Sequence, residues 1–126
     1  MAGLDLERQQ KEVCRRFGAT WFGCAPDLKV GVSKNVKTGI FPLNGFREPP
    51  SDDTSGWYVW AGEALSTDPN FFQPLHAVHL TNRCPVVLNY VGLPPGWRFL
   101  LAAKYEDVWY DASLLDKSDS EKPSTP

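Results

Sequence analysis

The chain has 126 residues, enough for one hydrophobic core and too few for two. Hydrophobic residues make up 42% and charged residues 22%, which excludes a disordered or fibrous chain. The N-terminus is charged rather than apolar, and no stretch reaches the about 18 apolar residues of a membrane span. We therefore expect a single cytoplasmic domain over residues 1–115 with no role in a membrane.

The net charge of −2 is distributed unevenly. Residues 1–50 hold eight Lys and Arg against five Asp and Glu, whereas residues 51–126 hold five against ten. An acidic second half disfavours nucleic-acid binding and would suit a basic partner protein. Solvated charges without any partner explain the same distribution equally well.

Three cysteines, Cys14, Cys24 and Cys84, are an odd number at wide and irregular spacings. This pattern disfavours a disulfide framework, and no CxxC pair indicates a zinc site. We interpret them as buried, reduced thiols.

An amphipathic helix is predicted over residues 4–17. Its apolar face is formed by Leu6, Gln10, Val13 and Phe17, at spacings of four, three and four. Gly18 provides the C-cap. Short strands are expected at 20–23 and 29–33, followed by a long loop over 35–54, where Gly, Pro, Asn and Asp are frequent.

The stretch GWYVWA predicts a strand over 56–61 with two apolar faces. Trp57 and Val59 would point to one side, and Tyr58 and Trp60 to the other. We expect one of these sides to pack beneath the N-terminal helix. The other side is expected to form a partly open aromatic surface.

The remaining elements complete an α+β fold. Asp68 and Pro69 resemble a helix start, and Pro74 would end that helix early. The other predicted elements are a helix over 85–92, a strand over 97–102, a turn near Lys104, a strand over 107–111 and a disordered tail over 116–126. The sum is a mostly antiparallel sheet of about four to six strands, the N-terminal helix and one or two short helices.

Two histidines and one cysteine suggest enzymatic alternatives. His76 and His79 lie three residues apart, and Glu63 or Asp68 could complete a metal site, but the HExxH arrangement is absent. Cys84 precedes Pro85 at a predicted helix start, where a thiol pKa is lowered and a histidine could act as base. Structural or interface histidines and a packed cysteine are the preferred interpretations.

Aromatic residues make up 13% of the chain and often lie close together, as in Phe71-Phe72 and Trp109-Tyr110. On strands, adjacent residues point to different faces, so one core cannot hold them all unless helices cover both sides of the sheet. We infer that some rings line a groove or contact a partner.

The segments TSGWYVWAGEALSTDPNFFQPLHAVHL and CPVVLNYVGLPPGWRFLLAAKYEDVWYD resemble the thirty-third family of immunity proteins from bacterial polymorphic toxin systems. The resemblance covers about residues 28–115 and rests on the order and spacing of these motifs. It implies a small cytoplasmic α+β protein, not an enzyme, that binds a cognate toxin and occludes its active or substrate surface. It assigns no catalytic residue, cofactor or metal.

We expect exposed aromatic, acidic and histidine side chains to contact such a toxin. The candidate contacts are Trp57, Trp60, Glu63, Asp68, Phe71, Phe72, His76, His79, Glu106, Asp107 and Trp109. Two alternatives stay open: a small hydrolase or metal-dependent enzyme using the residues above, and a module that binds a small ligand in an aromatic groove. The oligomeric state does not follow from the sequence.

Overall fold

A six-stranded sheet in the order β4-β1-β3-β2-β5-β6 forms the centre of the computed structural model, which describes residues 2–62, 65–66 and 68–115. The strands are β1 (Lys29–Ser33), β2 (Leu43–Arg47), β3 (Thr54–Ala61), β4 (Phe72–His76), β5 (Trp97–Ala102) and β6 (Tyr105–Tyr110). Only β1 and β3 pair in parallel among these strands; the other pairs are antiparallel. The predicted α+β fold with a mostly antiparallel sheet is confirmed.

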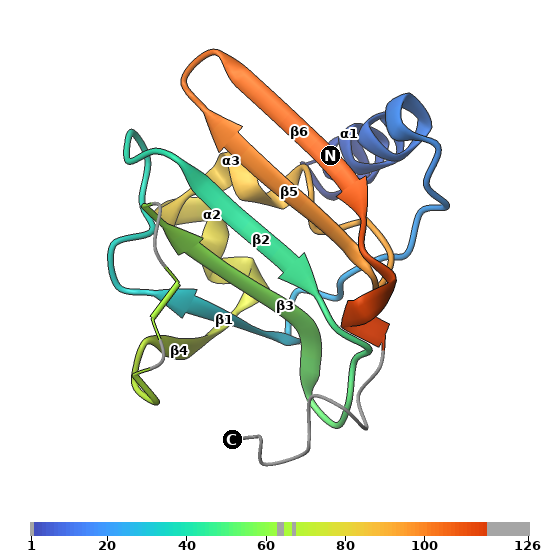
Figure 1. Cartoon of the computed structure of the whole chain (residues 1–126). Coiled ribbons are helices and arrows are strands. Elements are labelled where there is room, and N and C mark those ends of the chain that lie inside the picture. The colour runs from blue at the N-terminus through green and yellow to red at the C-terminus, as the bar shows by residue number, and fades with distance from the viewer. Residues whose placement is uncertain (1, 63–64, 67, 116–126) are drawn as a thin grey trace.

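The helices lie on one side of this sheet, as Figure 1 shows. They are α1 (Ala2–Phe17), the 3₁₀ turn η1 (Ala77–His79), α2 (Leu80–Arg83) and α3 (Pro85–Leu88), with a second 3₁₀ turn, η2 (Ala112–Leu115), after β6. Within the described residues no helix is both long enough and apolar enough to cross a membrane.

Helix α1 matches the predicted helix and ends before Gly18, whose φ of 78° suits a glycine. The one polar residue on its buried face, Gln10, is 5% exposed. Its amide donates to the Leu88 carbonyl at 2.9 Å and accepts from Trp21 Nε1 at 3.1 Å. This side chain therefore joins α1 to α3 and to the segment that follows α1.

Two predictions for the first half of the chain were wrong. Residues 20–23 form no strand, because the Phe22 amide donates to the Gly92 carbonyl at 2.8 Å instead of joining the sheet. The predicted loop over 35–54 contains β2, which pairs with β3 and β5. Gly45, which counted as a strand breaker, is required there because a Cβ would lie 2.3 Å from the Phe99 ring.

The helix expected after Asp68 was also wrong. The Asp68 carboxylate accepts the Asn70 amide at 2.8 Å, which closes a turn, and the chain continues as β4. The helix from Pro85 stops at Leu88 rather than 92, and the last strand begins at Tyr105 rather than 107. The predicted disordered tail, 116–126, lies outside the described residues.

The hydrophobic core lies between the sheet and the helices. Val13 and Cys14 of α1 belong to the same buried cluster as Trp57 and Val59 of β3. Trp57 is 1% exposed and donates its Nε1–H to the Val91 carbonyl at 2.9 Å. The indole is therefore buried, and its N–H group has a hydrogen-bond acceptor in the core.

Arg47, at the end of β2, is buried in this core at 1% exposure. Its guanidinium donates to the carbonyls of Ser55 (2.9 Å), Phe22 (2.9 Å), Gly23 (3.2 Å), Val91 (3.3 Å) and Leu93 (2.8 Å). It also lies over the Phe22 ring at 4.8 Å. Burial lowers the pKa of Arg47 to about 10, which still leaves it charged at neutral pH.

We expect Arg47→Ala to lower the free energy of unfolding by about 3 kcal/mol, because several buried carbonyls lose their donor together. Arg47→Lys should lower the free energy of unfolding by about 2 kcal/mol, because the single ammonium group of lysine cannot donate to all the carbonyls that the three guanidinium nitrogens contact. Urea denaturation measures both values. Arg8→Ala, on an exposed pair with Asp5, is the matched control and should change stability by less than about 0.5 kcal/mol. A lysine variant as stable as the wild type would contradict this role.

Candidate protein-binding face

The side of the sheet away from the helices carries the second set of side chains from each strand. On β3, Tyr58 and Trp60 point to this side while Trp57 and Val59 face the core, as the strand alternation predicts. Phe46 of β2 lies opposite Tyr58 of β3, so its side chain points to the same side of the sheet. Phe72 of β4, which lies opposite Ser33 of β1, also points to this side. No described α-helix covers this side (Figure 1).

Four rings form a continuous cluster here, which we call the aromatic face: Phe46, Tyr58, Trp60 and Phe72. Phe46 stacks on Tyr58 with centroids 5.3 Å apart, and Tyr58 meets the edge of Phe72 at 5.1 Å. Trp60 contacts Phe46 at 5.8 Å and Phe72 at 6.3 Å. Because every ring packs on at least two others, the contacts hold the cluster in one arrangement.

Arg98 extends the aromatic face towards β6. Its guanidinium lies 5.5 Å from the Phe46 ring and 5.7 Å from the Trp109 ring, and Nη1 donates to Asp111 at 3.1 Å. At the other end, Phe71 packs on Phe72 at 4.9 Å. The apolar surface thus runs from the β4 edge of the sheet to the β6 edge.

The aromatic face is neither fully buried nor fully open. Trp60 is 5% exposed, whereas Phe46, Tyr58 and Phe72 are half-buried and Trp109 is 37% exposed. Two buried donors on this side, Trp60 Nε1 and Arg98 Nε, have no hydrogen-bond partner among the described residues. Burial raises the pKa of the Tyr58 hydroxyl, and the Glu48 carboxylate raises it further.

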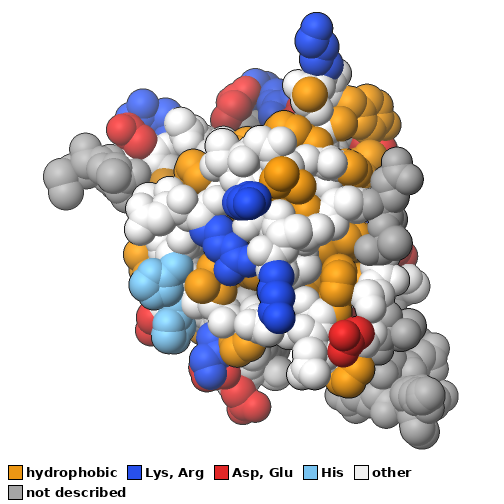
Figure 2. Space-filling model, turned by 90° about the vertical axis from the view of Figure 1, so that its left-hand side faces the viewer, with side chains coloured by type: hydrophobic (Ala, Val, Ile, Leu, Met, Phe, Trp, Pro, Cys, Tyr) orange, Lys and Arg blue, Asp and Glu red, His pale blue; other side chains and the backbone are white. Residues whose placement is uncertain are grey.

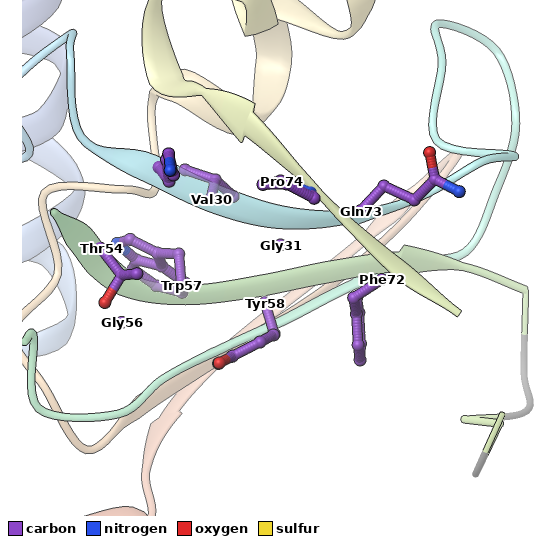
Figure 3. Close-up of a pocket in the computed structure, with 10 residues that line it drawn as sticks. Val30, Gly31, Thr54, Gly56, Trp57, Tyr58, Phe72, Gln73 and Pro74 are labelled. Carbon is purple, nitrogen blue, oxygen red and sulfur yellow. The ribbon is translucent and has the colours of Figure 1, made fainter. Parts of the chain in front are cut away.

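A small hollow of about 180 Å³ lies next to Tyr58 (Figure 3). Gly31 and Gly56 contribute no side chain to it, while Tyr58, Phe72 and Pro74 border it. A Cβ on Gly31 would lie 2.7 Å from the Tyr58 ring. The hollow is smaller than the roughly 300–1,000 Å³ of small-molecule sites.

A larger groove of about 590 Å³ lies on the opposite side of the molecule. It is bordered by Leu6 and Gln10 of α1, by Trp21 and Cys24, and by Val78 of η1. Its size falls within the range of small-molecule sites, but no ring of the aromatic face borders it. The two hollows are therefore separate features.

The structure separates the predicted contact residues into several groups. Trp60, Phe71 and Phe72 lie in or beside the aromatic face, and Asp107 and Trp109 flank it on β6. Trp57 lies in the core, so it presents no surface to a partner.

Asp68 lies in the turn before β4, and Glu63 lies outside the described residues. Phe46, Tyr58 and Arg98 were not among the predicted contacts. For Tyr58 the strand alternation was the available signal, whereas Phe46 was hidden by the wrong prediction of a loop.

His76 and His79 are both exposed, with ring centroids 6.1 Å apart. Figure 2 shows them at the margin of the β1–β4 side, whose middle carries Lys and Arg side chains. Lys34, Lys37 and Arg83 form no ion pair within the described part of the chain. Over the same residues, no group of three His, Cys, Asp or Glu is placed to hold a metal ion.

The cysteines are free thiols, and Cys14 and Cys84 are buried. The helix start was expected to lower the thiol pKa of Cys84, but burial raises that pKa instead. A thiol with a raised pKa is less often deprotonated at neutral pH. Cys84 therefore lacks the lowered pKa that would activate it as a nucleophile.

Glu106 points to the helix side of the sheet, away from the aromatic face. Its carboxylate accepts from Arg16 at 2.8 and 2.9 Å and from the Tyr90 hydroxyl. The hydrogen bond from Arg16 is the largest influence that lowers the Glu106 pKa. Burial and this carboxylate together raise the pKa of Tyr90. The cluster joins α1 to β6 and has a structural role.

These features define an α+β domain with one helix-covered sheet face and one aromatic sheet face. The chain belongs to the Imm33-like domain family, whose model matches residues 9–111. The match includes much of α1, and so extends further towards the N-terminus than the resemblance over about 28–115. No curated protein and no solved structure matches the chain.

We expect Glu106→Gln to lower the free energy of unfolding by about 1 kcal/mol at pH 7, a value kept small because both charged partners are partly exposed. Since folding lowers the Glu106 pKa, its stabilisation is present above the unfolded value near 4.5 and is lost as the pH falls through the lower folded value. The free energies of unfolding of the wild type and the variant should therefore become equal in acid. Urea denaturation at several pH values tests this. Glu12→Gln is the exposed control. A difference that persists in acid would contradict the ion pair.

Proposed function

We propose that this protein is a non-enzymatic immunity protein that binds a cognate bacterial toxin and occludes its active or substrate surface. Family membership supports the immunity role. The observation that carries the proposal further is the aromatic face, a preassembled cluster of rings on a sheet side that no described α-helix covers. Sequestration needs such a surface and no catalytic group.

The size and composition of this side suit a protein partner. Six strands at a spacing of about 4.8 Å make a sheet about 24 Å wide, close to the side of an 800 Å² contact patch. Large rings and Arg dominate binding energy in such patches. The rings that contact one another lose little side-chain entropy on binding.

The charge of the partner stays a prediction from the sequence. Beside the aromatic face, Asp107 forms no ion pair within the described residues, and its carboxylate accepts a hydrogen bond from the Tyr105 hydroxyl at 3.4 Å. A basic toxin residue next to Asp107 could form an ion pair with it without breaking an existing ion pair. The His76 and His79 side chains, which are exposed, would extend the contact at the β4 edge.

The 590 Å³ groove favours a second candidate function, binding of a small apolar ligand. Cys24 borders this groove and is the least buried of the three thiols. Slower modification of Cys24 by a thiol reagent in the presence of a candidate ligand would support it. The hydrolase alternative has no comparable support in the described residues, and elemental analysis of the purified protein tests its metal-dependent form.

Co-expression with a candidate toxin domain tests the main proposal. Growth should be restored, and the two proteins should co-purify. Tyr58→Ala and Phe72→Ala should each weaken the measured affinity at least about tenfold, because each removes a ring near the centre of the contact. Phe41→Ala, an exposed ring outside the aromatic face, is the control. Unchanged affinity in both variants with a folded protein would exclude this face.

Gly31→Ala tests the hollow separately. The new Cβ would displace the Tyr58 ring and fill the hollow, so affinity should fall several-fold, by roughly 1 kcal/mol, while the fold is retained. In a Tyr58→Ala background the same change should have little further effect, because the ring it displaces is gone. Isothermal titration calorimetry on the four proteins gives the coupling. Equal effects in both backgrounds would show that the hollow plays no part.

A further inference from the structure

The two edges of the sheet differ in how well they are protected. At the β4 edge, the Ala77 amide donates to the Leu28 carbonyl at 2.8 Å, so the odd-numbered residues direct their backbone groups towards β1. The backbone groups of Phe72, Pro74 and His76 therefore point outwards. Pro74 has no N–H and stands in the middle of this row. A proline at an outward position is a common way to stop further strand pairing.

The β6 edge has no such protection. The hydrogen bond from the Asp111 amide to the Gly96 carbonyl, together with the β5–β6 register, directs the odd-numbered residues of β6 towards β5. The backbone N–H and C=O groups of Glu106, Val108 and Tyr110 therefore point outwards. They form no backbone or side-chain hydrogen bond within the part of the chain that the structure describes. This strand has six residues, no proline and no bulge.

We propose that β6 pairs antiparallel with β6 of a second copy of this chain, which joins the two sheets into one. A strand can pair with itself in this way about a two-fold axis perpendicular to the sheet. The proposal concerns the backbone of the β6 edge and does not rest on toxin binding, although Asp107 and Trp109 also flank the aromatic face. It commits to a second copy because the charges on β6 select a self-complementary register.

The selected register is centred on Val108, which faces Val108 of the second copy. Asp107 then lies opposite Trp109 of the second copy, and Glu106 lies opposite its Tyr110, so no two acids face each other. A shift by two residues places Asp107 opposite either Asp107 or Asp111 of the second copy. Like charges at directly opposed positions are destabilising, so these shifts are disfavoured.

Exposed aromatic residues follow this edge. Tyr105, Trp109 and Tyr110 are 55%, 37% and 51% exposed. In the centred register Trp109 packs against the backbone and carboxylate of Asp107 from the second copy, and loses part of that exposure. Such an interface is short, so the dimer should form at micromolar rather than nanomolar concentrations.

Sedimentation of the purified full chain, over about 1–500 μM, tests the pairing without any toxin. The mass should rise with concentration towards twice 14.1 kDa. Trp109→Asp should weaken the dimer at least about tenfold, because two acid–acid pairs form across the axis, and Asp107→Lys added to it should restore dimerisation. Tyr105→Asp, which would face Asp111 of the second copy, should weaken it by the same mechanism. Val78→Asp is the control, because Val78 is an exposed residue of η1 and not of β6.

Disulfide trapping tests the register itself. Asp107 and Trp109 of opposing copies form a non-hydrogen-bonded pair with Cα atoms about 4.5 Å apart, which a disulfide can span. In a Cys24→Ser background, a mixture of Asp107→Cys and Trp109→Cys proteins should form a cross-linked dimer, and either protein alone should not. A monomer at every concentration, a dimer indifferent to both acidic variants, or cross-linking of each cysteine protein with itself alone would overturn the proposal.

Discussion

The buried guanidinium of Arg47 is the constraint on which the arrangement of this domain depends. Burying a charge without a carboxylate is costly unless polar groups surround it, and here the surrounding groups are carbonyls from three segments distant in sequence. Those carbonyls come from β3, from the chain after α1 and from the chain after α3. A hydrophobic core is non-directional, whereas this fork of donors defines where each segment lies. It thereby keeps the connecting segments on the helix side of the sheet.

Because the helices and connections gather on one side, the strand alternation has two different consequences. Trp57 and Tyr58 are adjacent in sequence, yet the first is buried with its donor satisfied and the second is half-buried among other rings. The glycines follow the same division. Gly45 makes room for Phe99 in the core, and Gly31 leaves a hollow beside Tyr58 on the other side. The core and the aromatic face are thus built from one set of strands.

The sequence was sufficient where local signals agreed with the tertiary structure. The amphipathic pattern of α1, the alternation of β3 and the β5–β6 hairpin were all predicted. It failed for β2, because Gly45 counted as a strand breaker until the Phe99 ring on the neighbouring strand explains it. It failed for β4, because Asp68 and Pro69 resemble a helix start although they form a turn before the strand. The candidate site was affected by the same failures. Phe46 was missed along with β2. Glu106 was expected to be an exposed contact, because its partner Arg16 lies ninety residues away in the sequence and no local pattern indicates the pair.

The β6 edge and the aromatic face belong to the same sheet, so pairing at the edge determines which way the aromatic faces of two copies point. Two sheets that pair edge to edge about a perpendicular two-fold axis keep their equivalent faces on the same side. Pairing through β6 would therefore leave both aromatic faces uncovered and directed the same way, since Phe46, Tyr58 and Phe72 come from β2, β3 and β4. A second bound partner would then lie beside the first. If the two partners also associate, each binding event raises the effective concentration for the other, and avidity increases without any new contact on the aromatic face.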